Sequence, residues 1–183
     1  TCGMILGDLG ADVIKVEPVE GDTTRRLVHQ GAGFFASYNR NKRSLALNLK
    51  TSDGIKVAQH LCAGADVVVE NLRPGAMDDL GLGYPPLSEK NPGLIYCALK
   101  GFLDGPYAHR KALDEVVQMM GGLAYMTGPE GRPLRAGASV TDIMGGMFGV
   151  IGIMAALRER QLSGQGQQVM AALFETTVHM VAQ

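Results

Sequence analysis

The longest uninterrupted apolar segment of the chain runs from Ile143 to Leu157, and it constrains the fold more than any other feature. It ends at Arg158, which makes it shorter than the roughly 20 residues that a membrane-spanning helix needs. We therefore predict a tightly packed core helix. Four glycines would let another backbone approach this helix closely. They are Gly145, Gly146, Gly149 and Gly152.

The segment before this run, residues 137–142 (GASVTD), predicts where the helix begins. Ser139 and Thr141 are good N-cap residues, so we expect Asp142 in or next to the first turn. Two interpretations of Asp142 remain open. It is either a capping acid, which the helix dipole favours by about 0.3–1 kcal/mol, or a reactive carboxylate with apolar walls and open backbone N–H donors nearby.

Predicted strands and helices alternate along the chain. The predicted strands are Asp12 to Glu17, Ser44 to Leu49, Asp66 to Glu70, Leu94 to Leu99 and Gln167 to Ala171. The predicted helices, besides the apolar one, are Cys2 to Leu9, Lys50 to about Ala63, Leu113 to about Ala124 and Phe174 to Gln183. This order predicts an α/β fold with a parallel sheet covered by helices on both faces. In such sheets, ligands bind at the carboxyl ends of the strands.

Composition and motifs narrow the possible chemistry. The 183 residues are 46% hydrophobic and carry a net charge of -1, which suits one globular domain and gives no general reason to expect nucleic acid or an acidic membrane as a partner. Three scattered cysteines without a CxxC pair favour a reducing, cytoplasmic compartment and indicate no zinc site. The sequence has no GxGxxG, GxxxxGK[ST] or GxSxG motif, and its four histidines lack the spacing of metal ligands. We therefore predict no metal.

Basic and amide side chains follow the predicted strands. Each alone is more often a solvated surface group. Together, at the ends of consecutive parallel strands, they indicate a site for an anionic, nucleotide-like ligand. These residues are Lys50, Asn71, Arg73, Lys100 and Lys111.

Several long segments resemble the family III CoA-transferases, which also include the α-methylacyl-CoA racemases. The matching segments are LGDLGADVIKVE (6–17), NRNKRSLALNL (39–49), VENLRPGAMDDLGL (69–82), LIYCALKGF (94–102) and GQGQQV (164–169). The chain resembles the formyl-CoA transferases in particular at Lys100 to Phe102, within the fourth of these segments, and at one further place, Lys111 to Gly122. The resemblance covers nearly the whole chain in the same order.

The resemblance implies a Rossmann-like large domain that binds CoA. Residues 1–183 would form its N-terminal part, without the first strand, the small domain and the C-terminal return. It also implies a homodimer of two interlocked, ring-like subunits. The substrates would be an acyl-CoA and a small carboxylic acid, with no tightly bound cofactor.

In the family, an aspartate at the position of Asp142 is the nucleophile. The implied reaction begins when this carboxylate attacks the acyl-CoA thioester and forms an acyl-aspartyl anhydride. The CoA thiolate then attacks the aspartyl carbonyl, which leaves an aspartyl-CoA thioester, and the acceptor acid reverses the sequence. Asp114 matches an acidic position of the family and is predicted to support Asp142, whereas its alternative is an ordinary acid at a helix N-terminus.

The same comparison assigns a CoA-binding role to several residues. Those predicted to contact CoA are Leu47, Asn48, Lys50, Asn71, Leu72, Arg73, Lys100 and Lys111. Two residues depart from the formyl-CoA transferases, which carry arginines where this chain has Pro18 and Asp79. We therefore expect the contacts to the CoA phosphates to differ in detail.

Two other functions remain as alternatives. A 2-methylacyl-CoA racemase needs an acid–base pair, and its family members use a histidine where this chain has Leu113, which cannot exchange a proton. A non-catalytic CoA-binding subunit would need Arg73 and Lys111 but not Asp142.

Overall fold

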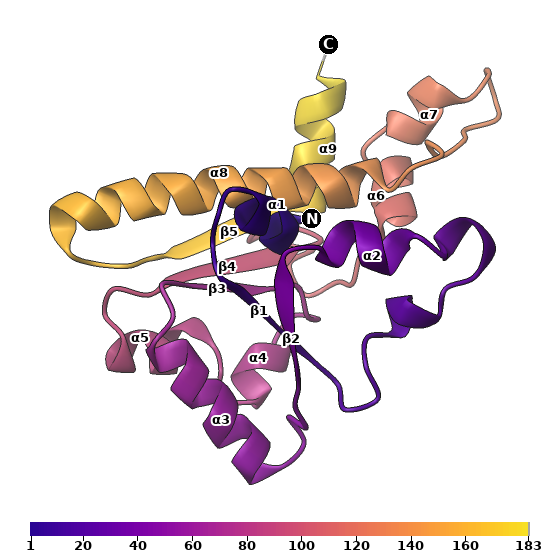
Figure 1. The fold of residues 1–183 in the computed structure, drawn as a ribbon. Helices are drawn as coiled ribbons and strands as arrows, with labels where there is room; N and C mark the ends of the chain where they lie inside the picture. The colour runs from indigo at the N-terminus through magenta and orange to yellow at the C-terminus, as the bar shows by residue number, and fades with distance from the viewer. Residues whose placement is uncertain (183) are drawn as a thin grey trace.

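The structure is a computed structural model that describes residues 1–182 (Figure 1). Its first elements, with η for 3₁₀ helices, are α1 (Cys2–Asp8), β1 (Val13–Glu17), η1 (Thr23–Arg26), η2 (His29–Gly31), α2 (Phe34–Asn39), β2 (Lys42–Ala46), α3 (Ser52–Ala63) and β3 (Val67–Glu70). They are followed by α4 (Ala76–Asp79), α5 (Tyr84–Lys90), β4 (Ile95–Lys100), α6 (Asp114–Met120), α7 (Leu123–Thr127), α8 (Val140–Ser163), β5 (Gln168–Ala172) and α9 (Leu173–Val181). The predicted parallel α/β fold is confirmed.

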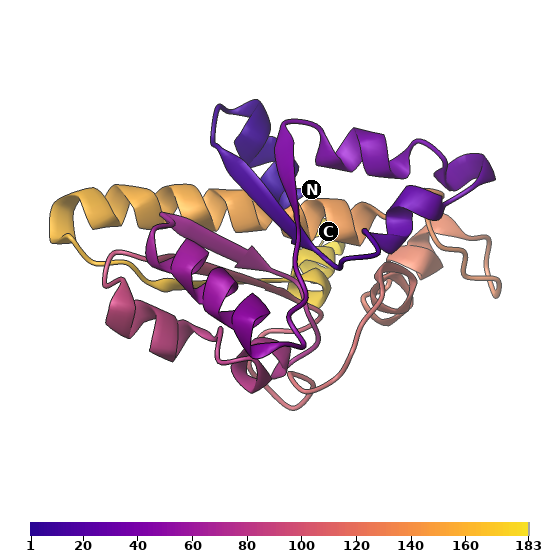
Figure 2. The ribbon, with the colours of Figure 1, turned by 60° about the horizontal axis from the view of Figure 1, so that its bottom comes forward.

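Within residues 1–182, the strands form two separate parallel sheets and not one continuous sheet. One sheet pairs β1 with β2, and the other has the order β3-β4-β5. The strands of the two sheets run in crossing directions in both views of the ribbon (Figures 1 and 2). Leu47 and Leu49, which follow β2, pack into the core of the three-stranded sheet and so connect the two parts.

Helices cover both faces of the three-stranded sheet, and β4 supplies the centre of both cores. Ile95 and Cys97 are fully buried against α1 and α8. The alternate residues Tyr96 and Ala98 face α3 and α5 on the other side. This arrangement explains why the strand is apolar at every position, since both of its faces are covered. Figure 1 shows α8 above the sheet and α3, α4 and α5 below it.

The predicted role of the glycines in α8 is confirmed. A side chain at Gly149 would lie 2.7 Å from Leu99 Cδ2, and one at Gly146 would lie 3.0 Å from the backbone nitrogen of Cys2. The glycines therefore let α1 and β4 sit directly against α8. These partners belong to the same chain.

Helix α8 is longer than the apolar run that predicted it, because it begins at Val140 and continues to Ser163. Its 24 residues are long and apolar enough to cross a membrane by length and composition alone. One face of α8 is nevertheless buried against α1, β4, β5 and α9, as in the core helix of a folded domain. The opposite face exposes Met147, Ile151 and Met154.

Several predicted boundaries were wrong. The helix predicted from Leu113 to about Ala124 is two helices, α6 and α7, because Gly121 and Gly122 break it and Gly122 has a φ of +90°. Strand β2 lies earlier than predicted, because it pairs with β1 only as far as Ala46 opposite Glu17. Helices α4 and α5 were not predicted.

Candidate active site at the start of helix α8

Asp114 caps helix α8 from outside that helix. Its Oδ2 atom accepts hydrogen bonds from the backbone nitrogens of Thr141 (2.9 Å) and Asp142 (3.3 Å) and from Thr141 Oγ1 (2.7 Å). Ser139 occupies the N-cap position, but its side chain makes no capping hydrogen bond within the described residues. Asp114 is only 7% exposed, so this is a buried carboxylate satisfied by the first turn of another helix.

Gln118 fixes the loop that leads into α8. It is fully buried and lies one turn after Asp114 on α6, where its Nε2 donates to Asp114 Oδ1 at 2.5 Å. Its Oε1 accepts from the backbone nitrogen of Ala136 at 2.7 Å, and its Nε2 also reaches the carbonyl oxygen of Ala138 at 3.4 Å. One amide group therefore holds both Asp114 and residues 136–138 in place.

Asp142 sits beside this network with its side chain exposed. Its pKa is raised, first because neighbouring atoms remove it partly from bulk water and second because of the negative charge of Asp114. Open backbone N–H donors were expected here, but the N–H groups of Thr141 and Asp142 are bonded to Asp114 and that of Val140 is bonded to the carbonyl oxygen of Ala138. Asp142 is therefore not the capping acid, and a raised pKa makes its carboxylate more basic than an ordinary aspartate.

Apolar and polar residues together line a hollow beside the first turns of α8. A cavity of about 480 Å³ lies between α1, α2 and α8, and Ile143 and Met147 from the first turns of α8 form one of its walls. Tyr38 and Arg40 contribute from the segment around α2. Asp142 itself is not among the residues that line this cavity, so the predicted apolar walls around its carboxylate stay a prediction.

Lys100 and Glu70 organise the loop after β3. Lys100 Nζ lies 2.5 Å from Glu70 Oε1, both side chains are largely buried, and the same ammonium donates to the carbonyl oxygen of Leu72 at 2.9 Å. Glu70 Oε2 accepts from the backbone nitrogen of Leu72 at 2.9 Å. The charge of Lys100 is therefore engaged in holding Asn71 and Leu72, which are exposed at the carboxyl end of β3.

The loop that carries Lys111 packs against the loop after β4. A side chain at Gly101 would lie 2.5 Å from the Cβ atom of Ala112, so only glycine permits this contact. Lys111 is exposed three residues before Asp114. The loop after β4 therefore touches the loop that leads into α6, whose first residue, Asp114, bonds the backbone of Asp142.

The remaining predicted CoA contacts lie in the turn before α3 and in the segment after β3. Asn48 and exposed Lys50 form the turn into α3, where Asn48 Oδ1 accepts from the nitrogen of Lys50 at 3.0 Å. Leu47 is half-buried in the core. Arg73 pairs with Asp79 at 2.9 Å on the surface, and exposed pairs of this kind contribute only about 0–1 kcal/mol. Within the described part of the chain, these residues share no hydrogen bond or ion pair with the Asp142 network.

Comparison with known proteins decides the family. The model of CoA-transferase family III matches residues 1–183. The chain belongs to this family. It is 41% identical to the mouse (Mus musculus) succinyl-CoA:glutarate CoA-transferase over 98% of the chain and 43% of that protein. It is 42% identical to the succinyl-CoA–L-malate CoA-transferase beta subunit of Chloroflexus aurantiacus over 96% of the chain and 45% of that protein, and 40% identical to the formyl-CoA:oxalate CoA-transferase of Streptomyces avermitilis over 96% and 44%.

Solved structures agree with this family assignment. A CaiB/BaiF family protein from Brucella suis superposes with a TM-score of 0.92 and 42% identity over 99% of this chain and 50% of that chain. Rv3272 from Mycobacterium tuberculosis gives a TM-score of 0.90 at 35% identity over 99% and 50%. The family III chain described here thus spans about half the length of the curated relatives it matches.

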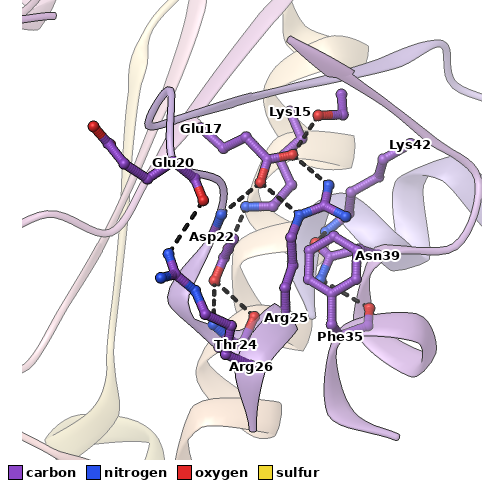
Figure 3. Close-up of polar contacts among 11 residues, drawn as sticks. Lys15, Glu17, Glu20, Asp22, Thr24, Arg25, Arg26, Phe35, Asn39 and Lys42 are labelled. Carbon is purple, nitrogen blue, oxygen red and sulfur yellow. Dashed lines mark hydrogen bonds and ion pairs between the residues drawn. The ribbon is translucent and has the colours of Figure 1, made fainter. Parts of the chain in front are cut away.

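A second charged cluster of this family III chain is built around Glu17 and Asp22. At the end of β1, buried Glu17 accepts from Arg25 Nη2 at 2.6 Å and from Ser44, while Arg25 stacks over the Phe35 ring at 3.8 Å (Figure 3). Asp22 accepts from Lys15 at 2.5 Å and from the nitrogen of Thr24. Arg25 holds the pKa of Glu17 well below its usual range, and the donors around Asp22 lower its pKa to about 2 although burial opposes them.

Gln118, Thr141 and Arg135 are site residues that sequence reasoning missed. Gln118 carried a weak signal, because it follows Asp114 by one helical turn and so shares its face. Thr141 was expected to cap α8 with its own side chain, whereas its hydroxyl bonds Asp114. Arg135 lies in a loop of irregular structure, where no periodicity indicates a neighbour.

Proposed function

We propose that the full-length protein moves CoA from an acyl-CoA thioester to a carboxylic acid, with Asp142 as the nucleophile. The observation that carries this proposal is the basic, exposed carboxylate of Asp142 beside the buried Asp114 network. Relatives named for succinyl-CoA, glutarate, L-malate and oxalate support the reaction class. Residues 1–183 would form the N-terminal part of the CoA-binding domain of a cytoplasmic homodimer.

The proposed reaction is a double displacement that needs no net proton transfer. The carboxylate of Asp142 attacks the thioester carbonyl, the C–S bond breaks, and CoA leaves as a thiolate while an acyl-aspartyl anhydride forms. The thiolate attacks the aspartyl carbonyl of this anhydride, which releases the donor acid and forms an aspartyl-CoA thioester. The acceptor carboxylate then attacks this thioester, and the released thiolate attacks the acceptor carbonyl to give the new acyl-CoA and free Asp142.

The surrounding residues would supply position and basicity. Carboxylates are weak nucleophiles, so fixed placement has to contribute a large share of the rate. Asp114 fixes the backbone nitrogen of Asp142 at 3.3 Å and its charge helps to raise the pKa of Asp142. Gln118 in turn fixes Asp114. The backbone of the proposed nucleophile is thus held by a buried hydrogen-bond network formed by Asp114 and Gln118.

CoA would lie along the edge formed by the loops after β3 and β4. Lys111 is exposed on this edge close to Asp114, and Asn71 and Leu72 are held at its other end by Lys100. We assign the nucleotide end of CoA to the side of Asn71 and Arg73, and the thioester to the side of Asp142. The surface pair of Arg73 with Asp79 is weak enough to open for a phosphate.

Trapping the covalent intermediates tests this proposal directly. The full-length protein is incubated with an acyl-CoA and then with hydroxylamine, and mass spectrometry examines the peptide that holds Asp142. We expect a hydroxamate on Asp142, and Asp142→Asn should abolish both the label and CoA transfer. Asp12→Asn is a matched control, because Asp12 is an exposed carboxylate far from α8 in sequence and pairs with Arg43. Transfer that continues while the Asp142 peptide stays unmodified would refute the assignment.

The racemase alternative is distinguished by the residue that precedes Asp114. Leu113 is 66% exposed at the N-cap of α6 and has no group that can carry a proton. We therefore expect no exchange of the substrate α-proton into deuterated water under conditions of CoA transfer. A non-catalytic CoA-binding subunit would instead bind CoA without turning over any pair of donor and acceptor.

A further inference from the structure

Arg135 lies beside the carboxylates of the candidate active site with its terminal nitrogens incompletely bonded. Its Nη2 is 3.5 Å from Asp114 Oδ1 and its Nη1 is 3.8 Å from Glu115 Oε2, both longer than ordinary charge-assisted hydrogen bonds. Only its Nε makes a normal hydrogen bond in the described residues, to the carbonyl oxygen of Ala136 at 3.1 Å. The side chain is 41% exposed, so the fork of the guanidinium is accessible to a ligand.

The backbone around Arg135 is fixed on both sides. The nitrogen of Leu134 donates to the carbonyl oxygen of Ala124 at 2.9 Å, and the nitrogen of Ala136 donates to Gln118 Oε1 at 2.7 Å. Although Arg135 belongs to a loop, its Cα atom is therefore anchored to α6 and α7. A guanidinium presented from a fixed backbone loses less freedom when it binds a ligand.

The charges around Asp142 explain why a cation is needed there. Arg135 faces the carboxylates of Asp114 and Glu115, and the charge of Asp114 also acts on Asp142, so an incoming anion would be repelled here. The positive charge of Arg135 acts on Asp142 as well, since it opposes the rise in the pKa of that group. A substrate that carries a second carboxylate would face the largest repulsion and would gain most from a bidentate guanidinium.

We propose that Arg135 binds the distal carboxylate of a dicarboxylic acyl group while the thioester carbonyl of the same group lies at Asp142. This proposal rests on the function proposed above and adds the substrate class. In an acyl chain with two or three methylenes, the distal carboxylate carbon lies roughly 4–5 Å from the reacting carbonyl carbon, given C–C bonds of about 1.5 Å. Arg135 Nη2 lies 3.5 Å from Asp114 Oδ1, and the other oxygen of Asp114 accepts from the backbone nitrogen of Asp142 at 3.3 Å. The guanidinium and the backbone of Asp142 therefore approach the two oxygens of one carboxylate.

A comparison of two acyl-CoA donors of the same shape tests this assignment. Succinyl-CoA and butyryl-CoA differ in having a carboxylate or a methyl group at the end of the acyl chain. With the full-length protein and one common acceptor, Arg135→Gln should lower kcat/KM for succinyl-CoA about 10–100-fold more than for butyryl-CoA. Arg135→Lys should retain part of the preference, because lysine keeps the charge but not the fork.

Arg132 provides the matched control. It lies in the same loop, is exposed, and makes no hydrogen bond or ion pair with the three carboxylates in the described part of the chain. Arg132→Gln removes the same charge and should leave the ratio of the two donors unchanged. If Arg135→Gln lowers kcat/KM for both donors equally, Arg135 only stabilises the loop and the proposal is wrong.

A binding measurement separates this proposal from the proposed reaction. Dissociation constants for succinyl-CoA and butyryl-CoA are measured by calorimetry with the full-length Asp142→Asn protein, with and without Arg135→Gln. A preference for succinyl-CoA that disappears with Arg135→Gln supports the proposal even if the wild-type protein transfers no CoA. A ratio of the two constants that Arg135→Gln leaves unchanged overturns it, whatever the outcome for transfer.

Discussion

Replacing Asp114 by asparagine tests the network that positions α8. In the wild-type chain, Gln118 Nε2 donates to Asp114 Oδ1 at 2.5 Å. The oxygen of the introduced asparagine would retain the bonds from Thr141, so its amide nitrogen would face the amide nitrogen of Gln118. Gln118 cannot simply turn over, because its Oε1 accepts from the nitrogen of Ala136. The substitution therefore places two buried donors against each other.

The expected cost follows from the burial of this contact. Leaving one buried donor without an acceptor costs about 1–3 kcal/mol, and the lost charge partner of Arg135 adds less than about 1 kcal/mol because that side chain is partly exposed. We therefore expect Asp114→Asn to lower the free energy of unfolding of the full-length protein by about 2 kcal/mol. Urea denaturation followed by circular dichroism measures this change as a shift in the midpoint.

A second substitution makes the prediction specific. In Asp114→Asn combined with Gln118→Glu, the new carboxylate can accept from both the introduced asparagine amide and the nitrogen of Ala136. The double variant should recover at least half of the lost stability, although it loses the weak bond to the carbonyl oxygen of Ala138 at 3.4 Å. Wild-type stability in Asp114→Asn, or losses that simply add in the double variant, would refute this description of the network.

Three further outcomes follow from the structure. Asp114 raises the pKa of Asp142, so the acid limb of the kcat/KM profile should move to lower pH in Asp114→Asn, and an unmoved limb would contradict the electrostatic coupling. Gly149→Ala should cost about 1–3 kcal/mol in urea denaturation, because its Cβ would lie 2.7 Å from Leu99 Cδ2 and within 3.6 Å of the sulfur atoms of Cys97 and Cys2. Gly145→Ala meets only Leu173, at 3.3 Å, and should be nearly neutral. The folded pKa of Glu17 lies below its usual 4.5, so its stabilisation should be full above that pH and fall below it, and Glu17→Gln should flatten this acid dependence of the unfolding midpoint.

The strands and the core helix could be predicted because their signals are local. Residues 67–70 and 95–99 are apolar at nearly every position, and both segments form strands of the buried sheet. The boundaries moved by one to three residues because the pairing register sets where a strand ends. Strand β2 ends where its partner β1 ends, at Ala46 opposite Glu17. After that pair, the backbone nitrogen of Leu47 donates one more hydrogen bond, to the carbonyl oxygen of Glu17 at 2.9 Å.

The short helices were missed for a different reason. Helix α5 carries Pro85 and Pro86 in its first turn, where proline is compatible with a helix although the same residues usually indicate a loop. The break between α6 and α7 had a visible signal in Gly121 and Gly122. It was overridden by the apolar residues that continue through both helices.

The contacts that define the candidate site could not be predicted from the local sequence pattern, because they join residues far apart in the chain. Asp142 could be selected by the likeness to the family, but its setting depends on Asp114, which lies 28 residues earlier. Gln118 reaches 18 residues forward to Ala136. No periodicity reports contacts of this separation, because they depend on how α6 and α8 pack together.

The capping role of Asp114 changes what the start of α8 can do for catalysis. A carboxylate that accepts the first N–H groups of a helix normally has a lowered pKa, and this would make a poor nucleophile. Here Asp114 accepts those hydrogen bonds. Asp142 therefore lies in the first turn of α8, but the N–H groups of Thr141 and Asp142 do not stabilise its own carboxylate. Its pKa is raised, which suits the proposed attack on a thioester. The same arrangement concentrates negative charge, and Arg135 is the cation that the structure places against it. Partial removal from water is the first cause of the raised pKa of Asp142, and the buried carboxylate of Asp114 is the second. The charge of Asp114 therefore contributes both to the reactivity of Asp142 and to the preference proposed for dicarboxylic acyl groups.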